Sequence, residues 1–194
     1  MNHLEEIDGI VLEIDGPGGN VDGTEEFGMA VKNSKKPVVS YVDGMSASAH
    51  YWVTAQSTWI VANSEITSWI GSIGTLVIHV NESAWLAQKG YEVEIIRAPQ
   101  SVDKARENSI EPLTDEARER LLAELSGITD LFTSQVQTGR GSRLKTGDEN
   151  IFTGKVYNGR DALKYGMIDA IGNLSDAVNK AAEIAETRKK LSFL

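Results

Sequence analysis

Short hydrophobic runs alternate with amphipathic runs along the first half of the chain. Nearly continuous apolar runs predict buried strands, and apolar residues spaced three or four apart predict helices. The predicted strands cover residues 7–14, 37–42, 59–62 and 91–97, and the predicted helices cover 21–33, 47–56 and 81–89. Strands that alternate with helices usually pair in parallel through right-handed crossovers, so the pattern predicts an α/β fold with a parallel sheet.

The last third of the chain has a different pattern. Residues 98–112 form a polar stretch that is long enough to be a functional loop. A long helix is predicted from Thr114 to about Thr138, and residues 139–142 are expected to break it. The remaining pattern predicts a short helix at 157–165, a short strand at 167–170 and an amphipathic helix at 174–190.

Composition excludes several classes of protein. A net charge of -9 argues against binding to nucleic acid or to anionic lipid, because both need a basic face. The chain has no cysteine, so disulfides and thiolate chemistry are absent. Its histidines are scattered without a metal-binding spacing, and we expect no metal and no cofactor. No apolar run reaches the ~18–20 residues that a membrane-spanning helix needs.

Ser48 is the strongest candidate for a nucleophile. It follows a predicted strand and a tight turn, and it begins a run of small and aromatic residues that is predicted to be helical. A hydroxyl at such a position is exposed, lies near free backbone N–H groups, and gains from the helix dipole when negative charge develops. The alternative is that Ser48 only caps the helix.

A nucleophilic serine needs a base. His50 is expected to face away from the Ser48 hydroxyl, because positions two apart on a helix point to different sides, and no nearby aspartate pattern would orient His79. A lysine is the other known solution, provided that burial lowers its pKa from about 10.4. Residues 37–88 contain no lysine or arginine, and Lys104, in the polar loop, is the best candidate. Its alternative is a solvated loop lysine.

Two glycine-containing turns offer further groups. Gly18 and Gly19 follow the first predicted strand and can present backbone N–H groups to a ligand oxygen, unless they form only a simple turn. The turn lacks the pattern of a dinucleotide-binding or phosphate-binding loop. Ser72, in a second turn, can donate to or accept from a buried amine.

Taken in order, these segments resemble the signal peptide peptidase A family of Ser/Lys peptidases, and they look closest to its short phage-type members, which include capsid-assembly proteases. The matching segments are 14–21, 46–52, 71–74, 104–118, 132–141 and 152–169. The resemblance covers roughly residues 7–172. It implies an α/β fold of the caseinolytic-protease/crotonase type, a spiral of repeated β-β-α and β-α-β units, with a helical C-terminal extension.

The resemblance also implies roles. Ser48 would be the nucleophile, Lys104 the general base, and Ser72 the residue that orients the lysine amine. The oxyanion hole would consist of the backbone N–H groups of Gly18 or Gly19 and of Ala49. The reaction implied is endopeptidase cleavage, through an acyl-enzyme, of signal-peptide remnants or of phage capsid or scaffold protein.

Further expectations follow from the same family. Residues 1–172 would form the peptidase core, and residues 173–194 a helix that packs on the core or on a neighbouring subunit. Subunits would assemble into a ring or dome. The location would be the cytoplasm of a bacterium or of a phage-infected host, and the protein would associate with a membrane only if an N-terminal anchor is missing from this chain. The resemblance also implies that the family's usual first strand would lie upstream of this chain's first predicted strand.

The chain departs from the family pattern near the predicted site. Gly16 stands where serine is usual, His50 and Trp69 stand where smaller residues are common, and residues 55–58 replace a typical Ala-Ala-Asp. Two other functions are compatible with the same fold. One is an acyl-CoA enzyme of the same fold, which would use paired acidic residues and need neither Ser48 nor Lys104. The other is a non-catalytic assembly scaffold.

Overall fold

The structure, a computed structural model, describes residues 7–145 and 147–191. The chain forms two compact units. One contains the described residues up to Gly74 and those from Thr129 onward, and the other consists of residues 75–128. Ser48 and Ser72 belong to the first unit, and Lys104 belongs to the second.

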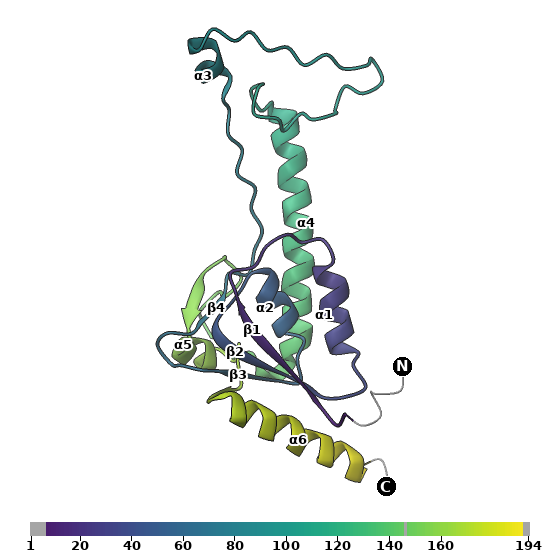
Figure 1. Ribbon diagram of the computed structural model, residues 1–194, viewed down its shortest axis with the longest axis vertical. Coiled ribbons are helices and arrows are strands. Elements are labelled where there is room, and N and C mark those ends of the chain that lie inside the picture. Colours follow the sequence, from purple (N-terminus) through teal and green to yellow (C-terminus); the bar gives the residue numbers. More distant parts are fainter. Residues whose placement is uncertain (1–6, 146, 192–194) are drawn as a thin grey trace. The chain divides into compact units, whose positions relative to one another are not determined.

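A mainly parallel sheet forms the centre of the first unit (Figure 1). Its strands are β1 (Ile10–Gly16), β2 (Val38–Ala47), β3 (Trp59–Ala62), β4 (Trp69–Gly71), β5 (Val156–Asn158) and β6 (Ala170–Ile171). The strand order is β5-β4-β2-β3-β6, and β1 pairs with β2. Only β4 and β5 pair antiparallel among these strands, so the predicted α/β fold with parallel pairing is confirmed.

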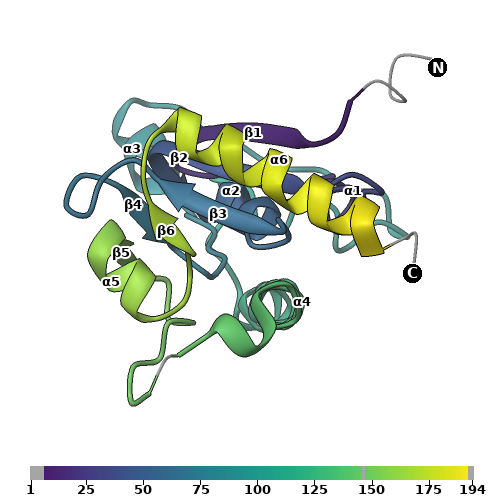
Figure 2. The same ribbon diagram turned by 90° about the horizontal axis from the view of Figure 1, so that it is seen from below.

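Helices cover both faces of this sheet. Helices α1 (Thr24–Lys32) and α2 (Ala49–Thr54) lie on one face, and α6 (Leu174–Leu191) runs along the other (Figure 2). Successive side chains of a strand point to opposite faces. Val39 of β2 therefore packs against Ala177 and Ala181 of α6, whereas Val38 packs with side chains of α1 and α2.

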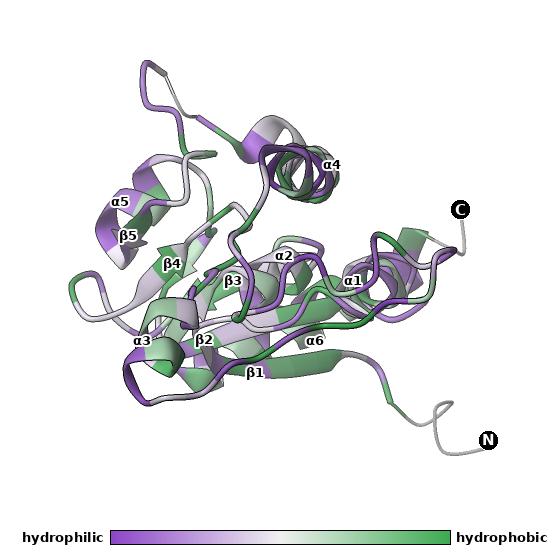
Figure 3. Ribbon diagram, turned by 90° about the horizontal axis from the view of Figure 1, so that it is seen from above, coloured by the Kyte–Doolittle hydropathy of each residue, from purple (hydrophilic) through white to green (hydrophobic). Residues whose placement is uncertain are grey.

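The apolar runs of the sequence became strands that are buried between these helices. Figure 3 shows β1 as a mainly hydrophobic strand, and Val39, Val42, Ile60 and Ala62 have no exposed surface. Burial on both faces explains why β2 reads as a continuous apolar run and not as an alternating one. Helix α6 packs on the same sheet. The domain boundary at residue 172 stays a prediction.

The last part of α4 (Asp115–Arg140) fixes α2 from the side. The rings of Trp52 and Phe132 stack with their centroids 4.5 Å apart, and Trp52 Nε1 donates to Gln135 Oε1 at 2.8 Å. These contacts bury the aromatic residues that follow Ser48. They therefore hold the helix that directly follows the candidate nucleophile.

Several predicted elements were wrong. Residues 91–97 form no strand, and Ile96 is 85% exposed; β-rich sequence alone does not supply a pairing partner. The predicted helix at 157–165 divides into β5 and α5 (Gly159–Lys164), where Asn158 Oδ1 caps the helix by accepting from Asp161 N–H at 2.9 Å. Helix α4 continues past the expected break to Arg140, and a 3-10 turn, η2 (Gly141–Arg143), follows.

The second unit contains α3 (Ser83–Gln88), the first part of α4 and long irregular segments. Helix α3 matches the predicted helix at 81–89 in all but its ends. Thr114 caps α4, because its Oγ1 accepts from Ala117 N–H at 3.2 Å. The predicted polar loop at 98–112 is confirmed as a stretch of turns and bends without helix or strand.

Candidate active site

Ser48 lies at the junction between β2 and α2. Its backbone N–H donates to Gly71 O at 2.8 Å, and its carbonyl accepts from Trp52 N–H at 2.9 Å. Between these bonds the backbone adopts φ 53° and ψ -126°, a region that costs a residue with a side chain of order 1–3 kcal/mol. The half-buried Ser48 is thus held in a strained turn, which is the arrangement that presents a nucleophile above a strand end.

Ser72 follows the neighbouring strand at the same edge of the sheet. Ala47 at the end of β2 pairs with Gly71 at the end of β4, so Ser48 and Ser72 each follow one member of a register pair. Ser72 also has a positive φ, 53°, and its N–H donates to Lys155 O at 2.7 Å. The sheet register therefore explains how two serines far apart in the sequence come to adjacent strand ends.

Backbone strain concentrates at the predicted catalytic positions. Among the residues that the structure describes, three that are not glycine have a positive φ: Ser48, Ser72 and Ala105. The first two are predicted site residues, and the third directly follows Lys104. Such strain persists only where the surrounding structure imposes it, and it clusters at functional sites.

The turn after β1 lies against Ser48. Gly18 has φ 105°, and a Cβ placed on it would lie 2.6 Å from Ser48 Cβ and 3.0 Å from Ser48 Oγ. Both the backbone conformation and the contact therefore require glycine at this position. The structure thus places Gly18 beside the candidate nucleophile, and Gly19 is the next residue of the same turn.

His50 contacts this turn, a relationship that the sequence analysis missed. The Gly18 N–H donates to His50 Nδ1 at 3.1 Å. A Cβ on Gly16 would lie 2.5 Å from His50 Cε1, so the imidazole occupies the space beside Gly16. The sequence held a signal for this contact, because the two departures from the family pattern, a smaller residue at 16 and a larger one at 50, compensate each other.

A pocket of about 320 Å³ opens beside the turn and the start of α2. Ile14, Phe27 and Val53 give it an apolar wall, and Gly19, Ala49 and His50 also line it. All of these residues belong to the first unit. The pocket therefore offers an apolar side chain a place next to the residues that flank Ser48.

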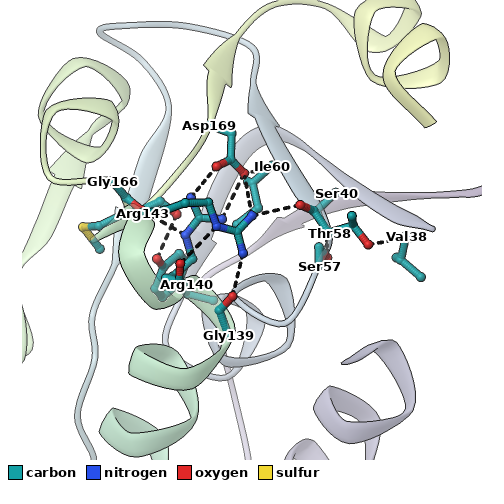
Figure 4. Close-up of polar contacts among 12 residues, drawn as sticks. Val38, Ser40, Ser57, Thr58, Ile60, Gly139, Arg140, Arg143, Gly166 and Asp169 are labelled. Carbon is teal, nitrogen blue, oxygen red and sulfur yellow. Dashed lines mark hydrogen bonds and ion pairs between the residues drawn. The ribbon is translucent and has the colours of Figure 1, made fainter. Parts of the chain in front are cut away.

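Arg140 and Asp169 form a buried ion pair, which the sequence analysis did not predict. Arg140 and Asp169 form two hydrogen bonds of 2.7 and 2.9 Å, and Arg143 also approaches Asp169 (Figure 4). Burial raises the pKa of Tyr51, whose hydroxyl donates to Met167 O at 2.9 Å. Burial also lowers the pKa of Arg143, and the charge of Arg140 adds to this effect. Both members of the pair lie in segments that carried the family resemblance.

Lys104 lies in a loop of the second unit that Arg97 organises. Arg97 Nε donates to Lys104 O at 2.6 Å, and Arg97 Nη2 donates to Ala105 O at 3.1 Å. Glu111 binds the same guanidinium through both carboxylate oxygens, at 2.6 and 3.0 Å. The hydrogen bonds from Arg97 and Asn108 lower the pKa of Glu111 to about 2. The backbone of Lys104 is thus held, while its side chain is exposed and its pairing with Ser48 stays a prediction.

The described residues include no group of three or more acidic, histidine or cysteine side chains that could hold a metal ion. Within residues 7–145 and 147–191, no helix is both long and apolar enough to span a membrane.

Comparison with known proteins gives the family. Residues 30–188 match peptidase family S49. The chain belongs to this family. Protease 4 of Salmonella typhi is 30% identical over 184 residues, which are 93% of this chain and 29% of that protein. Capsid assembly protease C of Escherichia phage lambda is 28% identical over 186 residues, which are 94% of this chain and 41% of that protein. The chain thus spans less than half the length of either relative.

A solved protease structure confirms the predicted fold class. A variant of the 1510-N membrane-bound stomatin-specific protease in complex with a substrate peptide aligns with a TM-score of 0.50 and 19% identity, over 92% of this chain and 67% of that one. At this identity the likeness concerns the fold alone. The signal peptide peptidase resemblance read from the sequence is confirmed by membership in family S49 and by the phage relative.

Proposed function

We propose that this chain is a serine endopeptidase in which Ser48 is the nucleophile and Lys104 the general base. Ser72 would orient the lysine amine, and backbone N–H groups of the glycine turn and of Ala49 would stabilise the oxyanion. The observation that supports this most is the strained Ser48, which follows a strand end and lies against Gly18. The role of Lys104 rests on the family resemblance and on the strained residue that follows it.

The reaction would proceed through an acyl-enzyme. The neutral amine of Lys104 takes the proton of Ser48 Oγ as this oxygen forms a bond to the substrate carbonyl carbon. The carbonyl oxygen becomes an oxyanion that accepts backbone N–H hydrogen bonds. The tetrahedral intermediate collapses, the peptide C–N bond breaks, and the amine leaves with the proton from Lys104. Water then attacks the ester by the same steps and releases the acid.

The substrate would be a peptide or a protein segment with an apolar side chain near the scissile bond. The pocket lined by Ile14, Phe27 and Val53 supports this preference, because most of its lining surface is apolar. The capsid assembly protease among the relatives supports phage capsid or scaffold protein as the substrate, with signal-peptide remnants as the other candidate. A location in the cytoplasm of a bacterium or phage-infected host remains part of the proposal.

Homo-oligomerisation is also part of the proposal. Eight large apolar side chains between residues 76 and 102 of the second unit are more than half exposed, in a segment with little regular structure. These residues are Leu76, Val77, Ile78, Val80, Trp85, Tyr91, Ile96 and Val102. A second copy of the chain would cover such a surface. Sedimentation velocity of the protein and of an Ile78→Asp, Ile96→Asp double variant tests this, and a wild-type monomer would contradict it.

A fluorophosphonate probe tests the chemistry directly. We expect the probe to label Ser48, and Ser48→Ala to lose both labelling and peptide hydrolysis. Lys104→Ala should lower both by several orders of magnitude, whereas Lys89→Ala, which removes another exposed lysine of the same unit, should leave them unchanged. A folded oligomer without any labelling would favour the assembly scaffold. Turnover of acyl-CoA thioesters that survives Ser48→Ala would favour the acyl-CoA enzyme.

A further inference from the structure

The side chain of His50 joins two features of the site, the glycine turn and the start of the helix that follows Ser48. It lies in the first turn of α2, two residues after Ser48. Its imidazole reaches back to the turn that follows β1 and accepts the Gly18 N–H at 3.1 Å. Gly18 in turn lies directly against Ser48. The imidazole is therefore separated from the candidate nucleophile by a single residue, Gly18.

We propose that His50 is a positioning residue of the oxyanion hole, which holds the Gly18 peptide through Nδ1 and so fixes the turn beside Ser48. This inference rests on the proposed peptidase function. Because Nδ1 accepts a hydrogen bond, the neutral ring carries its proton on Nε2. An N–H group that donates to an imidazole is not available to a developing oxyanion. The next N–H of the turn, that of Gly19, is therefore the donor that the turn presents to substrate.

The space beside Gly16 supports the same assignment. The imidazole fills the position that a side chain at residue 16 would take, since a Cβ there would meet Nε2 of the ring, and also Cε1 and Cδ2 at 2.5 and 2.9 Å. A glycine at 16 thus permits the ring to approach the Gly18 peptide. Without the ring, the Gly18 N–H would lose its partner, and the glycine-rich turn would gain conformational freedom at a large entropic cost for catalysis.

Two substitutions separate the hydrogen bond from the bulk of the ring. His50→Asn keeps an acceptor, because its Oδ1 lies close to where Nδ1 lies in histidine. His50→Leu keeps the volume and removes the acceptor. His79→Ala removes the other histidine of the described chain, which belongs to the second unit, and serves as the control.

The first measurement is the rate of Ser48 labelling by a fluorophosphonate, resolved into kinact and KI. Loss of one hydrogen bond corresponds to about five- to tenfold in rate. We expect His50→Leu to lower kinact by about that factor with KI changed less than about twofold, and His50→Asn to stay within about threefold of the wild-type kinact. His79→Ala should label like the wild type. Equal kinact for wild type and His50→Leu would overturn the assignment, as would a functional leucine variant beside a failing asparagine variant.

The second measurement does not depend on activity. Hydrogen exchange of the Gly18 amide, followed by NMR, should be about tenfold faster in His50→Leu and nearly unchanged in His50→Asn, because only the leucine variant lacks an acceptor. Unchanged exchange in His50→Leu would overturn the role of His50. A wild-type protein that no probe labels would instead overturn the proposed peptidase function, and the catalytic consequence of His50 with it.

Discussion

Arg140 binds Asp169 through Nη1 and Nη2, at 2.9 and 2.7 Å, and neither side chain is more than 5% exposed. Asp169 Oδ2 also accepts from the backbone N–H of Ile60 in β3, and Arg140 Nε donates to Gly166 O. The pair therefore ties the end of α4 to the sheet and to the segment before β6. Tyr51 of α2, the helix that follows Ser48, donates to Met167 O in the same segment before β6.

Removing one charge of this pair should destabilise the protein strongly. Asp169→Asn leaves the buried Arg140 without its carboxylate, and such a loss costs about 3–5 kcal/mol. Urea denaturation followed by circular dichroism measures the free energy of unfolding. The control is Arg160→Ala, which breaks an exposed pair with Glu65 and should cost less than about 1 kcal/mol. Similar losses for the two variants would contradict a structural role for Arg140–Asp169.

Gly18→Ala should reduce activity through geometry. The new methyl group would meet Ser48 Cβ and Oγ, and φ of 105° would be strained for alanine. We expect fluorophosphonate labelling to fall at least about tenfold, because about 1.4 kcal/mol of lost positioning already gives that factor. Gly127→Ala is the control, since its Cβ would meet nothing within 4 Å and alanine favours the helix. Full labelling of Gly18→Ala would show that the turn is not part of the site.

Gly16 and His50 should behave as a coupled pair. Gly16→Ala alone places a methyl group in the position of the imidazole and should displace the ring from the Gly18 N–H. The same change in a His50→Ala background meets no ring and should cost much less. A double-mutant cycle in urea should give a coupling energy of about 1–3 kcal/mol. Equal costs of Gly16→Ala in the two backgrounds would mean that the ring moves away freely.

The loop that carries Lys104 should loosen in acid. The hydrogen bonds from Arg97 and then Asn108 lower the pKa of Glu111 from 4.5 to about 2. A carboxyl whose pKa is lowered by folding stabilises the folded loop at pH values above 4.5, and this contribution is lost as the pH falls from 4.5 towards 2. NMR amide signals of residues 104–111 should therefore broaden or shift across this range.

Glu111→Gln should show the loosened loop already at neutral pH, because the glutamine cannot form the charged pair with Arg97. Glu119→Gln, at an exposed position of the same unit, is the matched control and should keep the wild-type pH dependence. An acid response that persists unchanged in Glu111→Gln would assign the transition to another group.

The parallel sheet and its helices could be read from the hydrophobic pattern, because strands buried on both faces leave continuous apolar runs. β3 was predicted with its observed ends, Trp59 and Ala62. The strand predicted at 91–97 was wrong, since the same apolar spacing fits a strand only when a neighbour pairs with it. The last residues of α4, Gly139 and Arg140, were missed because one glycine costs a helix only about 1 kcal/mol and does not by itself end it.

The order of short motifs along the chain was enough to give the family, the α/β fold and Ser48 as the candidate nucleophile, because these depend on local spacing and hydrophobic periodicity. The contact between His50 and Gly18 and the pairing of Arg140 with Asp169 could come only from the folded chain. The first joins residues that lie 32 positions apart in the sequence, and the second joins residues that lie 29 positions apart. Such contacts follow from strand register and helix packing, which no local pattern of residues encodes.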